Sequence, residues 1–208
     1  MSVAKKLTEQ ADIAIVDGGG ANIASLQFAL QRLGARAVLT SDHETIRRAT
    51  RVILPGVGAA RAAMEKLRSK GLDELIPNLS QPLLGICLGM QLLFDGSEED
   101  DATCLGLIEG RARRFDAAPE RPVPHMGWNR VEQTRNARLL DGIPDGAHFY
   151  FVHSYAVDTV STTTGCTDYG RTFTSVVRKG NFMGTQFHPE RSGVSGARLL
   201  QNFLQLVD

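Results

Sequence analysis

Short apolar runs alternate with helical patterns through the first half of the chain. The runs Ile13–Asp17, Ala35–Leu39, Arg51–Leu54 and Leu83–Cys87 have the length of buried strands, and helical patterns separate them. Strands that alternate with helices indicate βαβ units. We therefore predict a mainly parallel sheet with helices on both faces.

The segments between these runs predict helices with recognisable ends. We expect helices over Asn22–Leu33, closed by Gly34, over Asp42–Ala49, and over Ala59–Ser69, which ends at Gly71. The run Leu88–Phe94 reads as the start of another helix. This places Cys87 at a junction between a strand and a helix.

The second half has a weaker pattern. The stretch Asp95–Gly146, with charge clusters and prolines, predicts irregular exposed structure with short strands. Beyond it, the pattern predicts antiparallel strands with turns at Gly165 and Gly180, and then a last helix: the strands are His148–Tyr155, Thr172–Val177 and Phe182–Phe187, and the helix is Gly193–Val207. The predicted fold is α/β, with a mostly parallel central sheet flanked by helices and an added antiparallel β-section. We expect one domain over residues 13–208, preceded by an N-terminal extension at residues 1–12.

Composition narrows the possible partners. The 208 residues are 42% hydrophobic and 22% charged, as in ordinary soluble globular proteins. Lys plus Arg (23) balance Asp plus Glu (23), so the chain lacks the positive field that binds nucleic acid. No apolar segment has the length of a signal peptide or a membrane span, and we expect a cytoplasmic protein without a membrane partner.

The chain has three cysteines, each of which could bind a metal or act as a nucleophile. Cys87, Cys104 and Cys166 cannot all pair with one another, and their spacing is not that of a zinc site, so we predict no metal site. Cys87 stands in Gly85-Ile86-Cys87-Leu88-Gly89, and flanking glycines allow a sharp strand-to-helix turn that exposes a nucleophile. The start of the helix would favour the thiolate, and the Leu88 amide would face a developing oxyanion. The alternative is a buried cysteine in a core strand.

A thiolate nucleophile needs a histidine as general acid and base, and Gln186-Phe187-His188-Pro189-Glu190 offers one. On an extended chain His188 and Glu190 project to the same side, so the carboxylate can orient the ring. The other four histidines have packing, hydrogen-bonding or solvated roles as their alternatives.

Two glycine-rich segments differ in what they suggest. Pro55-Gly56-Val57-Gly58 follows a predicted strand and could supply a second oxyanion donor, although such a sequence is often only a turn. Gly18-Gly19-Gly20 does not continue as a dinucleotide-binding motif, so we interpret it as a tight turn rather than a nucleotide site. The chain also lacks a P-loop, and we predict no cofactor.

Together the three segments around Gly56, Cys87 and His188 resemble the class I (triad) glutamine amidotransferases over most of the chain, which implies their flavodoxin-like three-layer fold. The resemblance implies that Cys87 attacks the side-chain amide of L-glutamine, with Glu190 orienting His188. It places Leu88, Val57 and Gly58 at the oxyanion hole, and Gln91, Glu99, Ser154 and Tyr155 at the amino-acid end of the substrate. As alternatives, Gln91 is an exposed helix residue and Glu99 belongs to a solvated acidic run.

Two further segments are more specific. Pro124-His125-Met126-Gly127-Trp128-Asn129 and Phe149-Tyr150-Phe151-Val152-His153-Ser154-Tyr155 resemble the glutaminase subunits of imidazole glycerol phosphate synthases, from histidine biosynthesis. That resemblance implies a heterodimer with a (β/α)₈-barrel cyclase subunit. The cyclase takes the ammonia and converts a ribulosyl phosphate, PRFAR, to imidazole glycerol phosphate and an aminoimidazole carboxamide ribotide, AICAR. The residues that it places near the interface are His125, Trp128, Asn129, Tyr150 and Arg191; Trp128 as a core residue is the alternative.

Two other functions stay open. One is a different triad amidotransferase or cysteine hydrolase, such as the glutaminase of pyridoxal phosphate synthesis or a peptidase-like protein, which the Pro124–Asn129 segment disfavours. The other is a catalytically inactive binding subunit on the same fold. The presence of Cys87, His188 and Glu190 argues against it.

Overall fold

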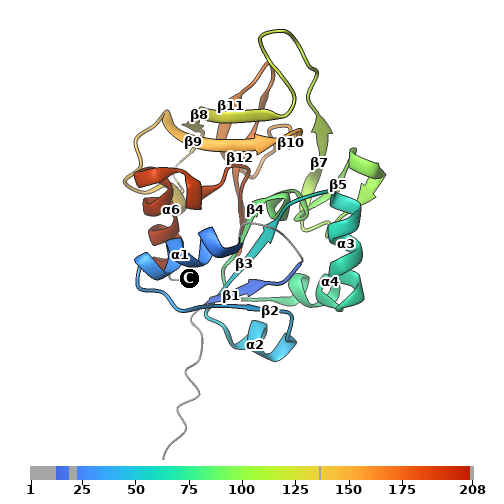
Figure 1. Ribbon diagram of the computed structural model, residues 1–208, viewed down its shortest axis with the longest axis vertical. Helices are drawn as coiled ribbons and strands as arrows, with labels where there is room; N and C mark the ends of the chain where they lie inside the picture. Colours follow the sequence, from blue (N-terminus) through green and yellow to red (C-terminus); the bar gives the residue numbers. More distant parts are fainter. Residues whose placement is uncertain (1–12, 19–22, 136, 207–208) are drawn as a thin grey trace, which may run out of the picture.

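A nine-stranded sheet forms the centre of the molecule (Figure 1). The computed structural model describes residues 13–18, 23–135 and 137–206; the predicted extension, Gly19, Gly20 and Asn22 lie outside them. The strand order is β2-β1-β3-β4-β13-β12-β11-β8-β9. Its first part is parallel: β1 (Ile13–Val16), β2 (Ala37–Thr40), β3 (Arg51–Gly56), β4 (Leu83–Cys87) and β13 (Phe182–Thr185).

Helices cover both faces of the parallel part. Figure 1 shows α1 (Ile23–Arg32) and α6 (Gly193–Gln205) on one side, and α3 (Ala60–Ser69) and α4 (Leu72–Leu75) on the other. Successive residues of β1 point to opposite faces: Ile13 and Ile15 join the core under α1 and α6, while Ala14 and Val16 join the core under α3 and α4. The prediction of a three-layer α/β fold is confirmed.

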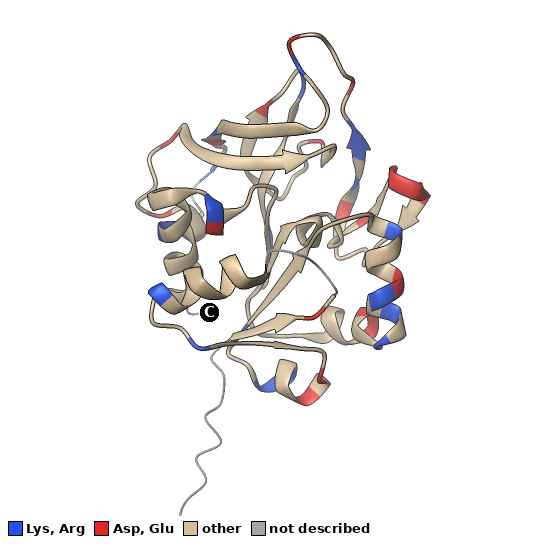
Figure 2. Cartoon of the chain, viewed as in Figure 1, with Lys and Arg blue, Asp and Glu red and all other residues tan. Residues whose placement is uncertain are grey.

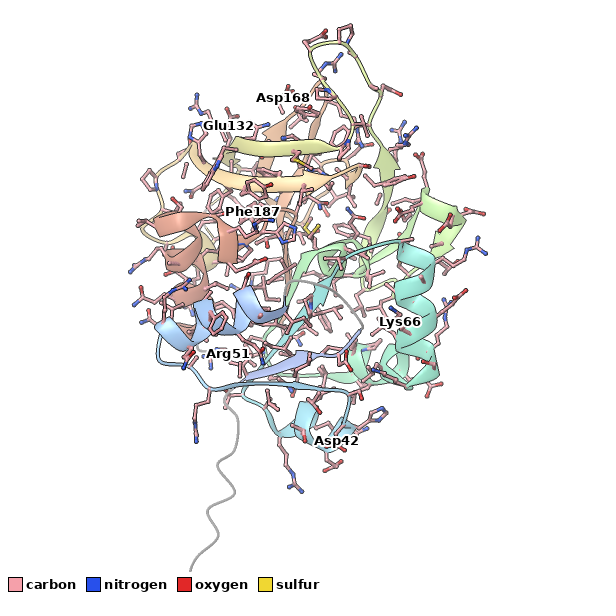
Figure 3. The ribbon with its side chains drawn as sticks, in the orientation of Figure 1. Asp42, Arg51, Lys66, Glu132, Asp168 and Phe187 are labelled. Atoms are coloured by element: carbon pink, nitrogen blue, oxygen red, sulfur yellow. The ribbon has the colours of Figure 1, made fainter. Side chains whose placement is uncertain are left out.

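Local sequence explains the ends of the helices. Gly34 follows α1 with φ +78°, as a C-terminal glycine should. The side chain of Asp42 accepts a hydrogen bond from the Thr45 amide at 2.8 Å and so caps α2 (His43–Arg48), at the foot of the view in Figure 3. In contrast, the helix expected over Leu88–Phe94 is a single turn, α5 (Leu88–Gln91), because Phe94 already begins a strand.

The structure differs most from the prediction in the middle of the chain. Residues 95–146 were expected to be irregular and exposed, with short strands. Short strands are present, but they form most of a four-stranded sheet in the order β10-β7-β5-β6, and the segment also contains the long strand β8. These strands are β5 (Phe94–Ser97), β6 (Ala102–Thr103), β7 (Ile108–Arg114), β8 (His125–Gln133) and β10 (Tyr155–Val157). Their core-facing side chains alternate with long charged ones, as in Arg111–Arg114, and this composition hid the strands.

The antiparallel part of the main sheet is also larger than predicted. It adds β8, β9 (Ala147–His153), β11 (Thr163–Asp168) and β12 (Thr172–Lys179) to β13. Gly180 does lie in the turn before β13, but the turn expected at Gly165 is wrong, since this residue pairs within β11. The apolar run His148–Tyr155 is divided at Ser154, where the chain passes from β9 in one sheet to β10 in the other.

Short 3₁₀ turns complete the described chain: η1 (Ile76–Asn78), η2 (Glu99–Asp101), η3 (Arg138–Leu140) and η4 (Pro189–Arg191). Basic and acidic residues are interspersed over the outer helices and loops (Figure 2). Within the described ranges, no helix is both long and apolar enough to cross a membrane.

Candidate active site

Cys87 lies in a strained turn where β4 ends and α5 begins. Its φ of +54° and ψ of −112° are unfavourable for a residue with a side chain. The neighbouring glycines allow the backbones of β3, β4 and α5 to touch. A Cβ on Gly89 would lie 1.8 Å from the Leu54 carbonyl oxygen, and one on Gly85 would lie 2.7 Å from the Gly89 oxygen. The glycines therefore hold the turn that presents the Cys87 thiol.

His188 and Glu190 meet beside this turn. His188 Nδ1 and Glu190 Oε1 are 2.9 Å apart, and both side chains are almost fully buried. The expectation of an extended chain through Glu190 was wrong: Pro189 begins η4, because its fixed φ suits a first helical position. This turn, rather than strand alternation, carries the carboxylate to the ring.

The charges of the site come from these contacts. Burial acts to lower the pKa of His188, but hydrogen bonds and charge attraction from Cys87 and Glu190 outweigh it and raise the pKa to about 10. Because α5 is only one turn long, its dipole offers less to the thiolate than the sequence suggested. A protonated His188 held between Cys87 and Glu190 is the arrangement that this geometry favours.

The thiol opens into a cavity of about 350 Å³. That volume suits a small polar ligand such as an amino acid. Its lining includes all of the residues that the sequence placed at the oxyanion hole and the substrate: Val57, Gly58, Leu88, Gln91, Glu99, Ser154 and Tyr155.

Two of these residues have contacts that decide between the alternatives. Gln91 is 4% exposed, so it is not an exposed helix residue; its Nε2 donates to the Tyr155 carbonyl and to Gln186 Oε1, both at 2.9 Å. Glu99 Oε2 accepts from the Ala60 amide at 2.9 Å and so also holds the start of α3. Its carboxylate is fixed at the cavity rather than free in a solvated run.

Sequence reasoning missed three residues at this site. Gln186 is completely buried, and its Nε2 donates to Cys87 Sγ at 3.8 Å. Ser192 ties the histidine segment to β9: its hydroxyl donates to the His188 carbonyl at 2.6 Å and accepts from the Tyr150 amide at 3.0 Å. His153 lines the cavity. For Gln186, its place beside the histidine was the one available signal.

The residues expected near a partner do not all reach the surface. Trp128 is 57% exposed, so it is not a core residue, and it packs edge-on against Tyr150 at 6.1 Å between ring centroids. The guanidinium carbon of Arg191 lies over the Tyr150 ring, 4.6 Å from its centroid, and Arg191 also lines the cavity. His125 needs correction: it is 3% exposed and lies behind the surface, with Asn129 half-buried beside it.

The described ranges contain no cluster of three His, Cys, Asp or Glu side chains arranged as metal ligands. A thiol, an imidazole and a carboxylate in contact are the groups that perform acyl transfer through a covalent sulfur intermediate.

The chain is similar to known proteins over most of its length. The family model for Glutamine amidotransferase class-I matches residues 14–206. The imidazole glycerol phosphate synthase subunit HisH of Xylella fastidiosa strain Temecula1 is 52% identical over 195 residues, which cover 94% of this chain and 98% of that protein. The HisH subunit of Xanthomonas axonopodis pv. citri is 51% identical with the same coverage.

Solved structures share the fold at low identity. A crystal structure of a glutamine amidotransferase matches with a TM-score of 0.72 and 20% identity, covering 93% of this chain and 97% of the other. A glutamine amidotransferase from Thermotoga maritima gives a TM-score of 0.62 and 16% identity, covering 91% of this chain and 80% of the other. The chain belongs to the class I glutamine amidotransferase family.

Proposed function

We propose that this chain is the glutaminase subunit of an imidazole glycerol phosphate synthase, which releases ammonia from L-glutamine for a cyclase partner. The observation that carries the proposal is the contact of Cys87 and His188 with each other, and of His188 with Glu190, at one cavity. The identity to HisH subunits over 94% of the chain supports the choice among amidotransferases.

The proposed reaction begins with attack of the Cys87 thiolate on the side-chain amide carbon of glutamine. A carbon–sulfur bond forms, and the carbonyl oxygen takes the negative charge. The amide of Leu88 and one in the Val57–Gly58 turn are the donors proposed for this oxyanion, and all three residues line the cavity. His188 then donates its proton to the departing nitrogen. The carbon–nitrogen bond breaks, ammonia departs, and a glutamyl thioester remains on Cys87.

Hydrolysis returns the enzyme to its first state. His188, now neutral, takes a proton from water as the water oxygen attacks the thioester, and glutamate leaves as the Cys87 thiolate forms again. Glu190 keeps the proton on Nδ1 of the ring, so that the other nitrogen faces the reaction. Gln91, Glu99 and the Ser154–Tyr155 backbone are the groups we propose for the amino-acid end of glutamine.

The partner is proposed to be a (β/α)₈-barrel cyclase, docked where β8 and β9 expose apolar side chains. Trp128 is 57% and Met126 62% exposed on β8, and an exposed aromatic anchor beside an arginine is typical of binding surfaces. Arg191 connects this surface to the cavity, since it touches Tyr150 and lines the site. We place the reaction in the cytoplasm, where Cys87 stays reduced.

One assay separates the three possible functions. Glutamate release from glutamine is measured with the chain alone, with the cognate cyclase, and with the cyclase and its ribulosyl phosphate ligand. We expect release to be stimulated by the liganded cyclase and to fall by about 10⁴-fold or more in Cys87→Ala. The control is Cys166→Ala, which removes a half-buried thiol on β11 and should act as wild type.

Other outcomes would reject parts of the proposal. Activity without any response to the cyclase would indicate another triad amidotransferase. No activity under any condition, with the cyclase still bound, would indicate an inactive binding subunit. Full activity in Cys87→Ala would reject the mechanism.

A further inference from the structure

A line of hydrogen bonds runs from the cavity wall into the protein through two buried histidines. His153 Nδ1 lies 2.8 Å from the Tyr155 carbonyl oxygen, and its Nε2 lies 3.0 Å from His125 Nδ1. At the far end, Asn129 Nδ2 lies 3.3 Å from His125 Nε2 and also donates to the Asp168 carbonyl. Figure 3 labels Asp168, the last residue of β11, in the upper part of the view.

The partners determine where each proton lies. A carbonyl can only accept, so His153 carries its proton on Nδ1 and accepts at Nε2. His125 must then donate from Nδ1, which leaves its Nε2 to accept from the Asn129 amide group. Both rings are therefore neutral Nδ1–H tautomers, and every ring nitrogen has a partner.

The surroundings keep the pair neutral. His125 stacks between Phe151 and Tyr169, at 5.0 and 3.9 Å between ring centroids, and Phe115 meets both histidines edge-on. Burial lowers the pKa of His125 to about 4 and that of His153 to about 3. The charged groups that face His153 are His188 and Arg171, and both oppose its protonation.

The carbonyl that His153 holds belongs to the proposed substrate site. The Tyr155 oxygen also accepts from Gln91 Nε2 at 2.9 Å. The second hydrogen of that nitrogen goes to Gln186 Oε1, and Gln186 in turn donates to Cys87 Sγ. Gln91 thus uses both of its donors inside the protein, and its oxygen remains to accept from the ammonium group of a substrate.

We propose that His125 and His153 are positioning residues, a neutral pair with fixed tautomers that holds the Tyr155 carbonyl and, through it, Gln91 in the geometry that binds glutamine. The pair acts at the break between β9 and β10, where the chain leaves one sheet for the other and needs a fixed anchor. The inference rests on the proposed glutaminase function and assigns a role to two residues outside the reacting triad.

The first test reads the tautomers directly and needs no activity. Long-range ¹H–¹⁵N spectra of the complex with labelled histidine should show His125 and His153 as Nδ1–H tautomers, constant from about pH 5.5 to about pH 9. Signals are assigned with His125→Asn and His153→Asn. An Nε2–H tautomer at either ring, or titration within that range, would overturn the proposal.

A second test removes the hydrogen-bond donor at the Asn129 end of the line and keeps the size of the side chain. Asn129→Asp replaces the donor to His125 Nε2 with a carboxylate, so Nε2 of His125 should gain a proton, either in the Nε2–H tautomer or in the imidazolium that a carboxylate partner favours at His188. Asn78→Asp, in η1, adds the same charge at an exposed position as the matched control and should leave both rings as in wild type. A His125 Nε2 that stays unprotonated in Asn129→Asp would contradict the proposed direction of the bonds.

The third test separates positioning from general support of the fold. In the liganded complex, His125→Leu should raise the KM for glutamine by about tenfold while kcat changes by less than about threefold. His125→Asn can still donate to His153 and should recover most of that loss. Equal losses in both variants, or a fall in kcat alone, would reject the positioning role. A wild-type complex with no glutaminase activity would instead reject the proposed function and leave the tautomer result standing.

Discussion

Two buried histidine sites share one cavity, and one is positively charged while the other is neutral. His188, between the end of β13 and the turn η4, has carboxylate and thiol partners that raise its pKa to about 10. His153, on the antiparallel part, has a carbonyl and a second histidine as partners, and burial lowers its pKa to about 3. Burial disfavours the cation at both sites, so the partner decides the charge. The charged site can transfer protons, whereas the neutral one can only hold a geometry.

The strongest way to break this contrast is to remove the charge beside His188. In Glu190→Gln the amide can donate to Nδ1 and favour the wrong tautomer, so we expect kcat to fall by about a hundredfold or more. The pKa of His188 should also fall, which moves the alkaline limb of the pH–rate profile to lower pH. Glutamate release by the liganded complex from about pH 6 to about pH 10 measures both effects.

Glu120→Gln is the matched control for this variant, because Glu120 is an exposed carboxylate in the loop between β7 and β8. It should retain the wild-type rate and profile. A Glu190→Gln enzyme with an unshifted alkaline limb would show that the carboxylate does not support the charge of His188.

A smaller effect is expected where the two sites join, at Gln186. Gln186→Leu removes the donor to Cys87 Sγ and leaves Gln91 Nε2 with one acceptor fewer, so kcat/KM should fall by about tenfold. Gln186→Glu keeps the volume but puts a second negative charge beside the thiolate, and we expect a larger loss. Steady-state kinetics of the two variants in the complex compare them; a glutamate variant that works as well as wild type would contradict an anionic sulfur.

The sequence predicts the parallel part and the strand-to-helix turn at Cys87 well because both depend on local patterns. Strand and helix periods identify β1 to β4, and glycines flanking Cys87 are required wherever backbones touch as closely as at Gly89. The pattern fails in β11, which has almost no apolar alternation. There Thr163 bonds to Thr174, and Thr167 to Ser175, so hydroxyl pairs between the neighbouring strands β11 and β12 replace an apolar face.

The same distinction applies within the site. Cys87, His188 and Glu190 stand in short motifs with recognisable chemistry, so residue type and spacing suffice to find them. The roles of Gln186 and His153 depend on distant partners: Gln186 contacts Cys87, 99 positions away, and His153 contacts His125, 28 positions away. Hydrogen-bond partners across two sheets depend on tertiary packing, which the local pattern of one sequence does not contain.

The smallest expected effect concerns stability rather than catalysis, and it compares the pH dependence of the two sites. The raised pKa of His188 contributes stability that is present below about pH 6.5 and is lost as pH rises through about 10. The lowered pKa of His153 contributes stability that is present above about pH 6.5 and is lost as pH falls towards about 3.

Between about pH 6 and pH 4 the unfolded chain binds one more proton at His153, which costs about 1.4 kcal/mol of folding stability per pH unit. His153→Asn removes that proton, so its free energy of unfolding should fall less steeply with acid, by about that slope, in urea titrations at each pH. His148→Asn, at an exposed position of the same strand, is the control and should keep the wild-type slope. If His153→Asn kept it as well, the ring would already be charged in the folded protein, and the contrast between the two histidine sites would be wrong.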